Sequence, residues 1–273
     1  MNSAVHRLFT AVKYLTYALL MLNVLLFLQE ELGALRHTYG SAVDPRQIVQ
    51  VFSATIDTAA WVVLLLLFEL ETSVLDDARI RGGVRRALHG TRALCSLAIV
   101  WAFSGYWAEM LALYRSVELP DWNGCRHIAG DWSLLLDLDR YAPLDADNCG
   151  SVADGAVRLA GFDIVAAPPV LQQARWLAWT DVINAGAWIL VVTVLEIEVR
   201  LQLRGRLTDA VLGGMRYIKY ALYSVLGLAA LYWGHAGDFL DFWDASLWLF
   251  AFIFIELNVF DWQRETHAAA PAP

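Results

Sequence analysis

The chain has 273 residues, of which 58% are hydrophobic and 18% are charged, and its formal net charge is −8. This charged fraction is below the quarter that is usual for soluble domains and indicates a membrane protein. The sequence contains no basic patch of the kind that binds phosphate backbones, so we expect no nucleic-acid partner.

Six apolar runs are long enough to cross a bilayer, which takes about 20 helical residues. They predict membrane helices at 9–29, 50–70, 93–114, 176–197, 217–235 and 239–260. The first run is followed by "QEELGALRH", which has no small-residue cleavage site, so we interpret it as a retained span. The expected fold is an all-α, polytopic membrane protein with six transmembrane helices, a single membrane domain over residues 1–270 in contact with the lipid bilayer.

Two connections between the predicted spans are rich in positive charge. The connection after the second span carries Arg79, Arg81, Arg85, Arg86 and Arg92, and the one after the fourth carries Arg200, Arg204, Arg206, Arg216 and Lys219. Loops of this kind stay in the cytoplasm. We therefore expect both termini to be cytoplasmic in a multi-pass cell-membrane protein of the bacterial inner-membrane type.

The acid-rich segment 116–175 then becomes an extracytoplasmic loop, which could also dock a protein partner. Because Cys125 and Cys149 would lie in an oxidising compartment, we predict a disulfide between them. Free thiols or a metal site are the alternatives, but His127 alone would leave a zinc site short of ligands. Two D-x-D pairs favour a solvated acidic loop over a calcium site, since the glycine and distal Glu of a calcium loop are missing: Asp137 and Asp139, and Asp145 and Asp147.

A repeated pattern ends the even-numbered spans. Each copy has an Asp or Asn, a Trp four residues later, a Glu after eight more, and a Glu or Asn two residues beyond. The copies are Asp57, Trp61, Glu69 and Glu71; Asn184, Trp188, Glu196 and Glu198; and Asp244, Trp248, Glu256 and Asn258. Partial coincidence does occur, because Trp101 and Glu109 reproduce one of the spacings.

The odd-numbered spans carry a repeat of their own. The first opens with Lys13-Tyr14-x-x-Tyr17 and the fifth with Lys219-Tyr220-x-x-Tyr223, while Arg92 stands at the corresponding place in the third. The two patterns together predict three parallel-repeat hairpins with pseudo-threefold symmetry about an axis near the membrane normal. These hairpins cover 9–70, 93–197 and 217–260.

Depth divides the repeated polar residues into two sets. The inner acids are Glu69, Glu196 and Glu256. We expect them at the same depth in the membrane as three cations that open the odd-numbered spans: Lys13, Arg92 and Lys219. Structural ion pairs are the favoured interpretation of that level, and a cation-binding ring is the alternative.

The outer set lies inside the predicted spans and consists of Asp57, Asn184 and Asp244. Ionisable residues inside a span are costly and point to function. The outer set is therefore either the lining of a passage for protons or small cations, or a polar cluster that fixes helix packing.

Signatures of familiar chemistry are missing from the sequence. The histidines lie at span ends, loops and tails, and no hydrolase, zinc-protease or phosphate-loop motif is present. We expect no cofactor, no metal site and no catalytic residues. Two hypotheses follow: a channel or transporter passing protons or small cations between repeated hairpins, or a non-catalytic membrane subunit or scaffold whose polar residues are structural.

Overall fold

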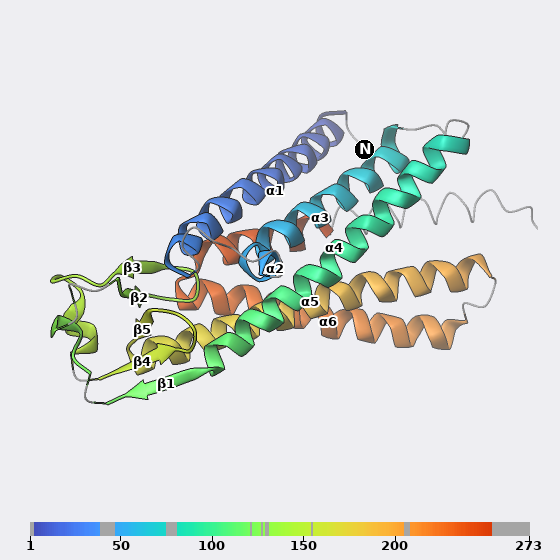
Figure 1. The fold of residues 1–273 in the computed structure, drawn as a ribbon. Coiled ribbons are helices and arrows are strands. Elements are labelled where there is room, and N and C mark those ends of the chain that lie inside the picture. The colour runs from blue at the N-terminus through green and yellow to red at the C-terminus, as the bar shows by residue number, and fades with distance from the viewer. Residues whose placement is uncertain are drawn as a thin grey trace, which may run out of the picture.

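The computed structural model describes residues 3–38, 47–74, 81–120, 122–126, 128, 131–153, 155–204 and 208–252. Long helices run side by side in an elongated bundle, and a small sheet forms one end of it (Figure 1). The labelled helices are α1 (Ser3–Thr38), α2 (Ile48–Val51), α3 (Ser53–Glu69), α4 (Gly82–Tyr114), α5 (Pro168–Leu203) and α6 (Asp209–Ala236). A further helix, described over 239–252, follows α6.

Four helices are long and apolar enough to cross a membrane: Arg7–Thr38, Ser53–Thr72, Gly82–Tyr114 and Pro168–Gln202. They include most or all of the first four predicted spans, and Ser53–Thr72 continues past α3 through a π-helical turn, η1 (Leu70–Val74). The predicted span 217–235 lies within α6, and 239–260 starts in the last helix but ends outside the described residues. Within the described residues, neither of these two predicted spans is among the helices that are long and apolar enough to cross a membrane.

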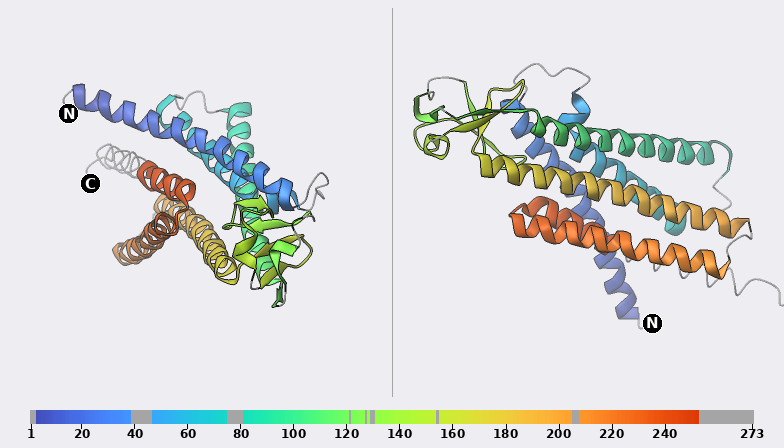
Figure 2. Two further views of the ribbon diagram at one scale, coloured as in Figure 1. Left: turned by 90° about the vertical axis from the view of Figure 1, so that its left-hand side faces the viewer. Right: turned by 90° about the horizontal axis from the view of Figure 1, so that it is seen from below.

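Three helices meet at the centre of the bundle: α3, α5 and the helix at 239–252. The ring of Trp61 lies 6.5 Å from the rings of both Trp188 and Trp248, measured between centroids. Helices α1, α4 and α6 pack around these three, with α4 against α3 and α5, α1 against α3, and α6 against α5. Figure 2 shows this arrangement from two further sides.

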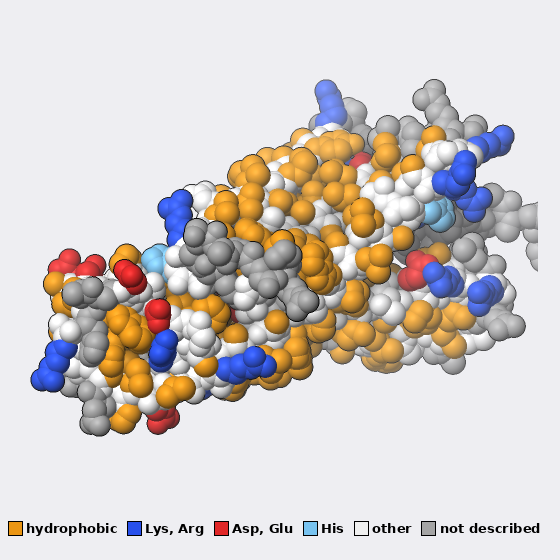
Figure 3. Space-filling model, in the orientation of Figure 1, with side chains coloured by type: hydrophobic (Ala, Val, Ile, Leu, Met, Phe, Trp, Pro, Cys, Tyr) orange, Lys and Arg blue, Asp and Glu red, His pale blue; other side chains and the backbone are white. Residues whose placement is uncertain are grey.

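The surface of the bundle is apolar where a bilayer would surround it. Hydrophobic side chains cover the middle of the face shown in Figure 3, and leucines on the outer helices are widely exposed, including Leu97 (69%) and Leu231 (67%). Helix α4 begins and α5 ends at the end of the bundle remote from the sheet (Figure 1), which we call the basic end because Arg85 and Arg86 near the start of α4 and Arg200 in the last turn of α5 lie there. The opposite end is called the sheet end.

The expectation of an all-α fold is wrong for the segment after α4, which forms a five-stranded sheet in the order β1-β4-β5-β2-β3. Its neighbours pair antiparallel except β2 and β5, which are parallel. The strands are β1 (Ser116–Leu119), β2 (Ser133–Leu135), β3 (Tyr141–Pro143), β4 (Ala156–Leu159) and β5 (Ile164–Ala166). Strands of three or four residues are too short for alternation to show in a sequence, and β2 and β5 are buried along their whole length.

The predicted disulfide between Cys125 and Cys149 is confirmed, with 4.9 Å between the two Cα atoms. It links the short 3₁₀ turns η2 (Gly124–Arg126) and η3 (Cys149–Val152), and so closes the irregular part of the sheet segment. Cys95 is buried within α4, as expected for a packing residue.

Side chains fix the sheet to the bundle. On α1, His37 Nδ1 lies 3.0 Å from Ser133 Oγ, and the His37 ring stacks on Tyr141. On α5, Arg175 donates to the carbonyl of Leu113 and to Ser116 Oγ, both at 3.0 Å. One hydrophobic core therefore runs from the strands into α4, α5 and α6.

Candidate functional site

A cavity of about 90 Å³ lies at the sheet end, between α1, α4, α5, the helix at 239–252 and the sheet. Six carboxylates from these elements line it, and the residues that surround it include no Lys, Arg or His. The six are Glu30, Glu31, Glu109, Asp139, Asp181 and Asp241. A cavity with this lining, which we call the sheet-end cavity, carries a concentrated negative charge.

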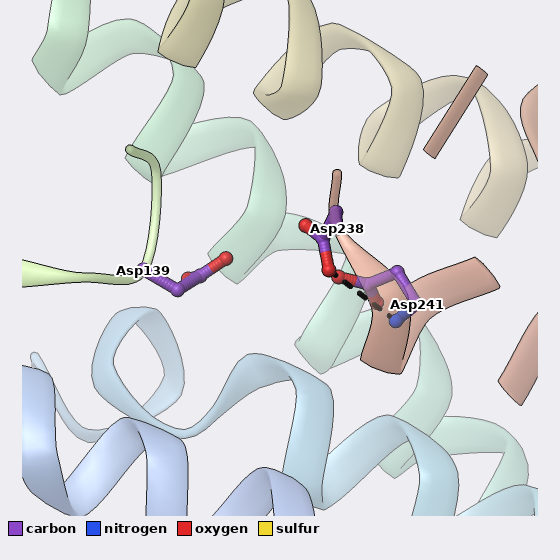
Figure 4. A group of neighbouring side chains, drawn as sticks. All are labelled: Asp139, Asp238 and Asp241. Atoms are coloured by element: carbon purple, nitrogen blue, oxygen red, sulfur yellow. Dashed lines mark hydrogen bonds between the residues drawn. The ribbon is translucent and has the colours of Figure 1, made fainter. Parts of the chain in front are cut away.

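Three aspartates approach each other beside this cavity, and two of them, Asp139 and Asp241, line it (Figure 4). One carboxylate oxygen from each of Asp139, Asp238 and Asp241 lies within 4.8 Å of the others. Asp139 comes from the turn between β2 and β3, whereas the other two begin the helix at 239–252. Gly237 ends α6 with a left-handed φ of 90°, which is strained for other residues, and this turn places Asp238 beside the cavity.

Burial and like charge act in the same direction on these loop aspartates. Burial raises the pKa of Asp139 well above its usual range, and the carboxylates of Glu109, Glu30, Asp181 and Asp238 raise it further. Burial also raises the pKa of Asp238. At neutral pH the cluster is therefore predisposed to take up protons or cations.

Glu31 has a structural role within this acidic group. Its carboxylate accepts from the backbone N–H of Ala54 at 2.8 Å and from the N–H and hydroxyl of Thr55. These N–H groups belong to the first turn of α3 and have no partner within the helix. Glu31 thus caps α3 from α1 and offsets the positive end of its dipole.

A second cavity of about 40 Å³ lies deeper in the bundle, and we call it the central cavity. The predicted outer set, Asp57, Asn184 and Asp244, lines it from the three central helices. The two cavities share four lining residues: Phe27, Tyr106, Asp181 and Asp241. Because the two cavities share these residues, they lie next to each other, and carboxylates line both of them.

Two asparagines in the central layer have an unusual feature. Asn23 is 1% exposed and donates from Nδ2 to Asp244 Oδ1 at 2.7 Å. The side-chain oxygens of Asn23 and Asn184 are the only buried side-chain polar atoms, among the described residues, without a hydrogen-bond partner. Both are acceptors, and buried acceptors are normally satisfied.

Tryptophans close the central cavity toward the basic end. Trp188 and Trp248 belong to its lining, and Trp61 contacts both of them. Each lies four residues, or about one helical turn, after the Asp or Asn of its own helix. The rings therefore form a layer directly beneath the polar layer.

The best-buried ion pair among the described residues lies at the basic end. Lys13 Nζ is 2.6 Å from Glu69 Oε1, with side chains 10% and 6% exposed. The hydroxyls of Tyr14 and Tyr17 donate to the same carboxylate at 3.1 Å and 3.4 Å. Glu69 is therefore surrounded by three donors, as expected for a structural ion pair.

The other two predicted cations meet a different acid. Arg92 pairs with Glu71, and Lys219 Nζ is 3.0 Å from Glu198 Oε2. In both pairs the acid is the last residue of the repeated pattern, and it precedes the cation by 21 residues. Positions two apart on a helix point about 200° apart, so the two acids of one copy face different neighbours.

Glu196 therefore has a different partner from the one expected. Its carboxylate pairs with Arg200 at 2.7 Å on the exposed face of α5, one helical turn away. Glu256 and Asn258 lie outside the described residues. The inner level is thus held by three inter-helix ion pairs, but they do not repeat one pairing scheme.

Several carboxylates of the sheet-end cavity and of the aspartate cluster beside it escaped sequence analysis. Glu30, Asp238 and Asp241 stand at span ends in "QEEL" and "GDFLDF", where acid is ordinary for an interface. Glu109 was noted only for its distance from Trp101. The D-x-D pairs do not act as units, because Asp139 joins the cavity while its neighbour Asp137 pairs with Arg140.

Neighbouring cavities lined by oxygen acceptors are suited to holding protons or hard cations, for which carboxylate and amide oxygens are the preferred ligands. Comparison with protein-family models, curated proteins and solved structures found no match.

Proposed function

We propose that this membrane protein passes protons or small cations between the sheet end and the basic end of its bundle. The observation that carries the proposal is the presence of carboxylates in two neighbouring cavities that share lining residues and whose linings include no basic side chain. Keeping so much acid within apolar helices costs free energy, and membrane proteins retain such residues on ion pathways.

The distribution of acidic residues supports entry of cations from the sheet end. Acidic walls raise the local concentration of cations, and the cluster of Asp139, Asp238 and Asp241 lies beside the sheet-end cavity. From there Asp181 and Asp241, which line both cavities, lead to Asp57 and Asp244 in the central layer. The path thus descends from the sheet to the centre of the bundle.

Helix packing supports the repeat that the sequence predicts. The central helices bring the same pattern positions to one layer, and each outer helix packs beside a central one. We take the whole as six spans in three hairpins with pseudo-threefold symmetry, forming one membrane domain over 1–270. In that arrangement the arginine-rich end and both termini are cytoplasmic in the cell membrane, and the disulfide-linked sheet is outside.

The tryptophan layer favours a second candidate function. Because Trp61, Trp188 and Trp248 fill the centre beneath the polar layer, the path is closed toward the basic end in this conformation. A conducting protein would have to displace these rings. A non-catalytic subunit would keep them as packing, hold its polar residues for helix specificity, and use the sheet to dock a protein partner.

Flux through reconstituted protein separates the two functions. Proteoliposomes would carry a trapped pH dye or a sodium dye, and a potassium diffusion potential would drive cation entry. We expect flux from the wild type and its loss in Asp57→Asn/Asp244→Asn, whereas Glu196→Gln, a change at an exposed carboxylate, should leave it intact. If no cation moves in any orientation of the potential, the scaffold function replaces conduction.

A further inference from the structure

We infer that Asn23, Asp57, Asn184 and Asp244 form a binding site for a dehydrated divalent cation of the calcium class. This inference rests on the proposed function, since it names the ion that the central layer would hold. The observation that starts it is independent of the acidic residues: two buried amide oxygens lack any donor.

The unpartnered oxygens belong to the same layer as two carboxylates. Asn184 lines the central cavity together with Asp57 and Asp244, and Asn23 is joined to Asp244 by its amide nitrogen. A water or protein donor would normally satisfy buried carbonyl oxygens. A metal cation satisfies them as well, and it also neutralises the carboxylates beside them.

Chemistry and charge select the class of cation. The polar oxygens near this layer of the central cavity come from carboxylates, from an amide and from the hydroxyl of Thr58. The nitrogens there belong to indole and amide groups. Oxygen ligands are typical of hard cations, and nitrogen- or sulfur-preferring metals would find no His or Cys in the lining. Four carboxylates line this cavity, and a divalent ion offsets more of their charge within an apolar bundle than a monovalent ion would.

The size of the cavity and the flexible coordination geometry of calcium favour calcium over magnesium. The cavity of about 40 Å³ can hold an ion with a single water. Magnesium retains several waters and demands octahedral geometry, whereas calcium accepts carboxylate and amide oxygens in irregular arrangements. The sheet-end cavity, which shares lining residues with this one, supplies the route of entry.

Protonation is the competing explanation for the same layer. Protons on Asp57 and Asp244 would remove both charges, and their hydroxyls could donate to the amide oxygens. Binding measurements distinguish the two, because calcium must displace protons from a protonated layer, which lowers its apparent affinity.

The test uses the full-length protein in detergent, stripped with EGTA and titrated with CaCl₂, MgCl₂ or NaCl while thermal unfolding is followed. We expect calcium to raise the melting temperature at concentrations up to about 1 mM, as for weak extracellular sites, and sodium to have no effect at the same ionic strength. In Asn184→Leu the half-saturating calcium concentration should rise at least about tenfold. Without calcium this variant should melt no lower than wild type, because it removes an unpartnered acceptor and keeps the volume.

The control variant is Asp139→Asn/Asp238→Asn, which removes the acidic cluster beside the sheet-end cavity and leaves the central layer intact. It should keep the calcium affinity within a few-fold of wild type. If calcium does not stabilise the wild type, if Asn184→Leu keeps full affinity, or if only the control variant loses it, the site is refuted. Calcium binding without flux would instead overturn the proposed conduction, and proton flux without calcium binding would overturn this site alone.

Discussion

At the scale of single residues, a buried ion pair and an exposed ion pair contribute differently to stability. Lys13 and Glu69 are almost fully buried, and Glu69 also accepts from two tyrosine hydroxyls, whereas Glu196 and Arg200 pair with side chains 58% and 67% exposed. Removing one partner of a buried pair strands the other charge, at a cost of about 3–5 kcal/mol. An exposed pair contributes about 0.3–0.5 kcal/mol because water screens it.

A double-mutant cycle tests this difference. We expect Glu69→Gln to lower the free energy of unfolding strongly and Lys13→Gln to restore part of the loss, with a coupling of about 0.5–3 kcal/mol. Thermal or denaturant unfolding in detergent measures it. The matched cycle, Glu196→Gln with Arg200→Gln, should give a coupling near zero. Equal couplings in the two cycles would contradict the structural role assigned to the buried pair.

Asp139 predicts how stability depends on pH. Burial raises the pKa of Asp139 in the folded protein, so the folded state binds its proton more tightly than the unfolded chain, whose aspartates titrate at about 3.9. The free energy of unfolding therefore falls as pH rises from about 4 through the raised pKa, and it recovers on acidification.

Melting temperatures in detergent between pH 5 and pH 8 measure this effect. In Asp139→Asn the decline toward alkaline pH should be smaller, because the variant has no carboxyl to charge. Asp163→Asn, a change on the exposed surface of the sheet segment, should retain the wild-type slope. A slope unchanged by Asp139→Asn would show that other groups cause it.

At the scale of elements, close packing of α2 against α4 positions the wall of the sheet-end cavity. A Cβ atom on Gly105 would lie 2.3 Å from the carbonyl oxygen of Val49, and this neighbour is backbone that cannot rotate away. The short helix α2 can rest on α4 only because this position has no side chain. Gln50 and Val51 of α2, which line the cavity, are placed by the same contact.

Gly105→Ala should therefore destabilise the protein by about 1–3 kcal/mol, the usual cost of overpacking. The control is Gly90→Ala in the same helix, where a Cβ atom would meet nothing within 4 Å. That variant should be neutral or more stable by up to about 1 kcal/mol, because alanine favours the helix. Similar melting temperatures for the two variants would contradict the close approach.

At the scale of the whole molecule, topology is the main prediction. Single-cysteine variants in a Cys95→Ala background, with the disulfide retained, should react with a membrane-impermeant maleimide from opposite sides. Positions 85 and 204 should react only from the cytoplasmic side, and position 163 only from outside. Position 263 should react like position 85 if the last helix crosses the membrane. Reaction of position 204 from outside would reverse the orientation.

Sequence alone was sufficient for features that depend on one helix or one compartment. Apolar runs of about 20 residues located the first four spans, because a bilayer admits little else. The positions of Cys125 and Cys149 in an acid-rich loop were enough to predict their disulfide. Identical spacing also nominated Asp57, Asn184 and Asp244, since spacing along a helix converts directly into depth and facing.

Only the tertiary structure decided which elements face each other. Asp139 lies about 100 residues from Asp238 and Asp241, and no local pattern reports that a turn of a sheet will meet the start of a helix. The pairing of Arg92 with Glu71, in place of Glu196, likewise depends on how neighbouring helices are rotated. Depth follows from the sequence of each helix, whereas contacts across helices follow from packing, which depends on the shapes of all the helices at once.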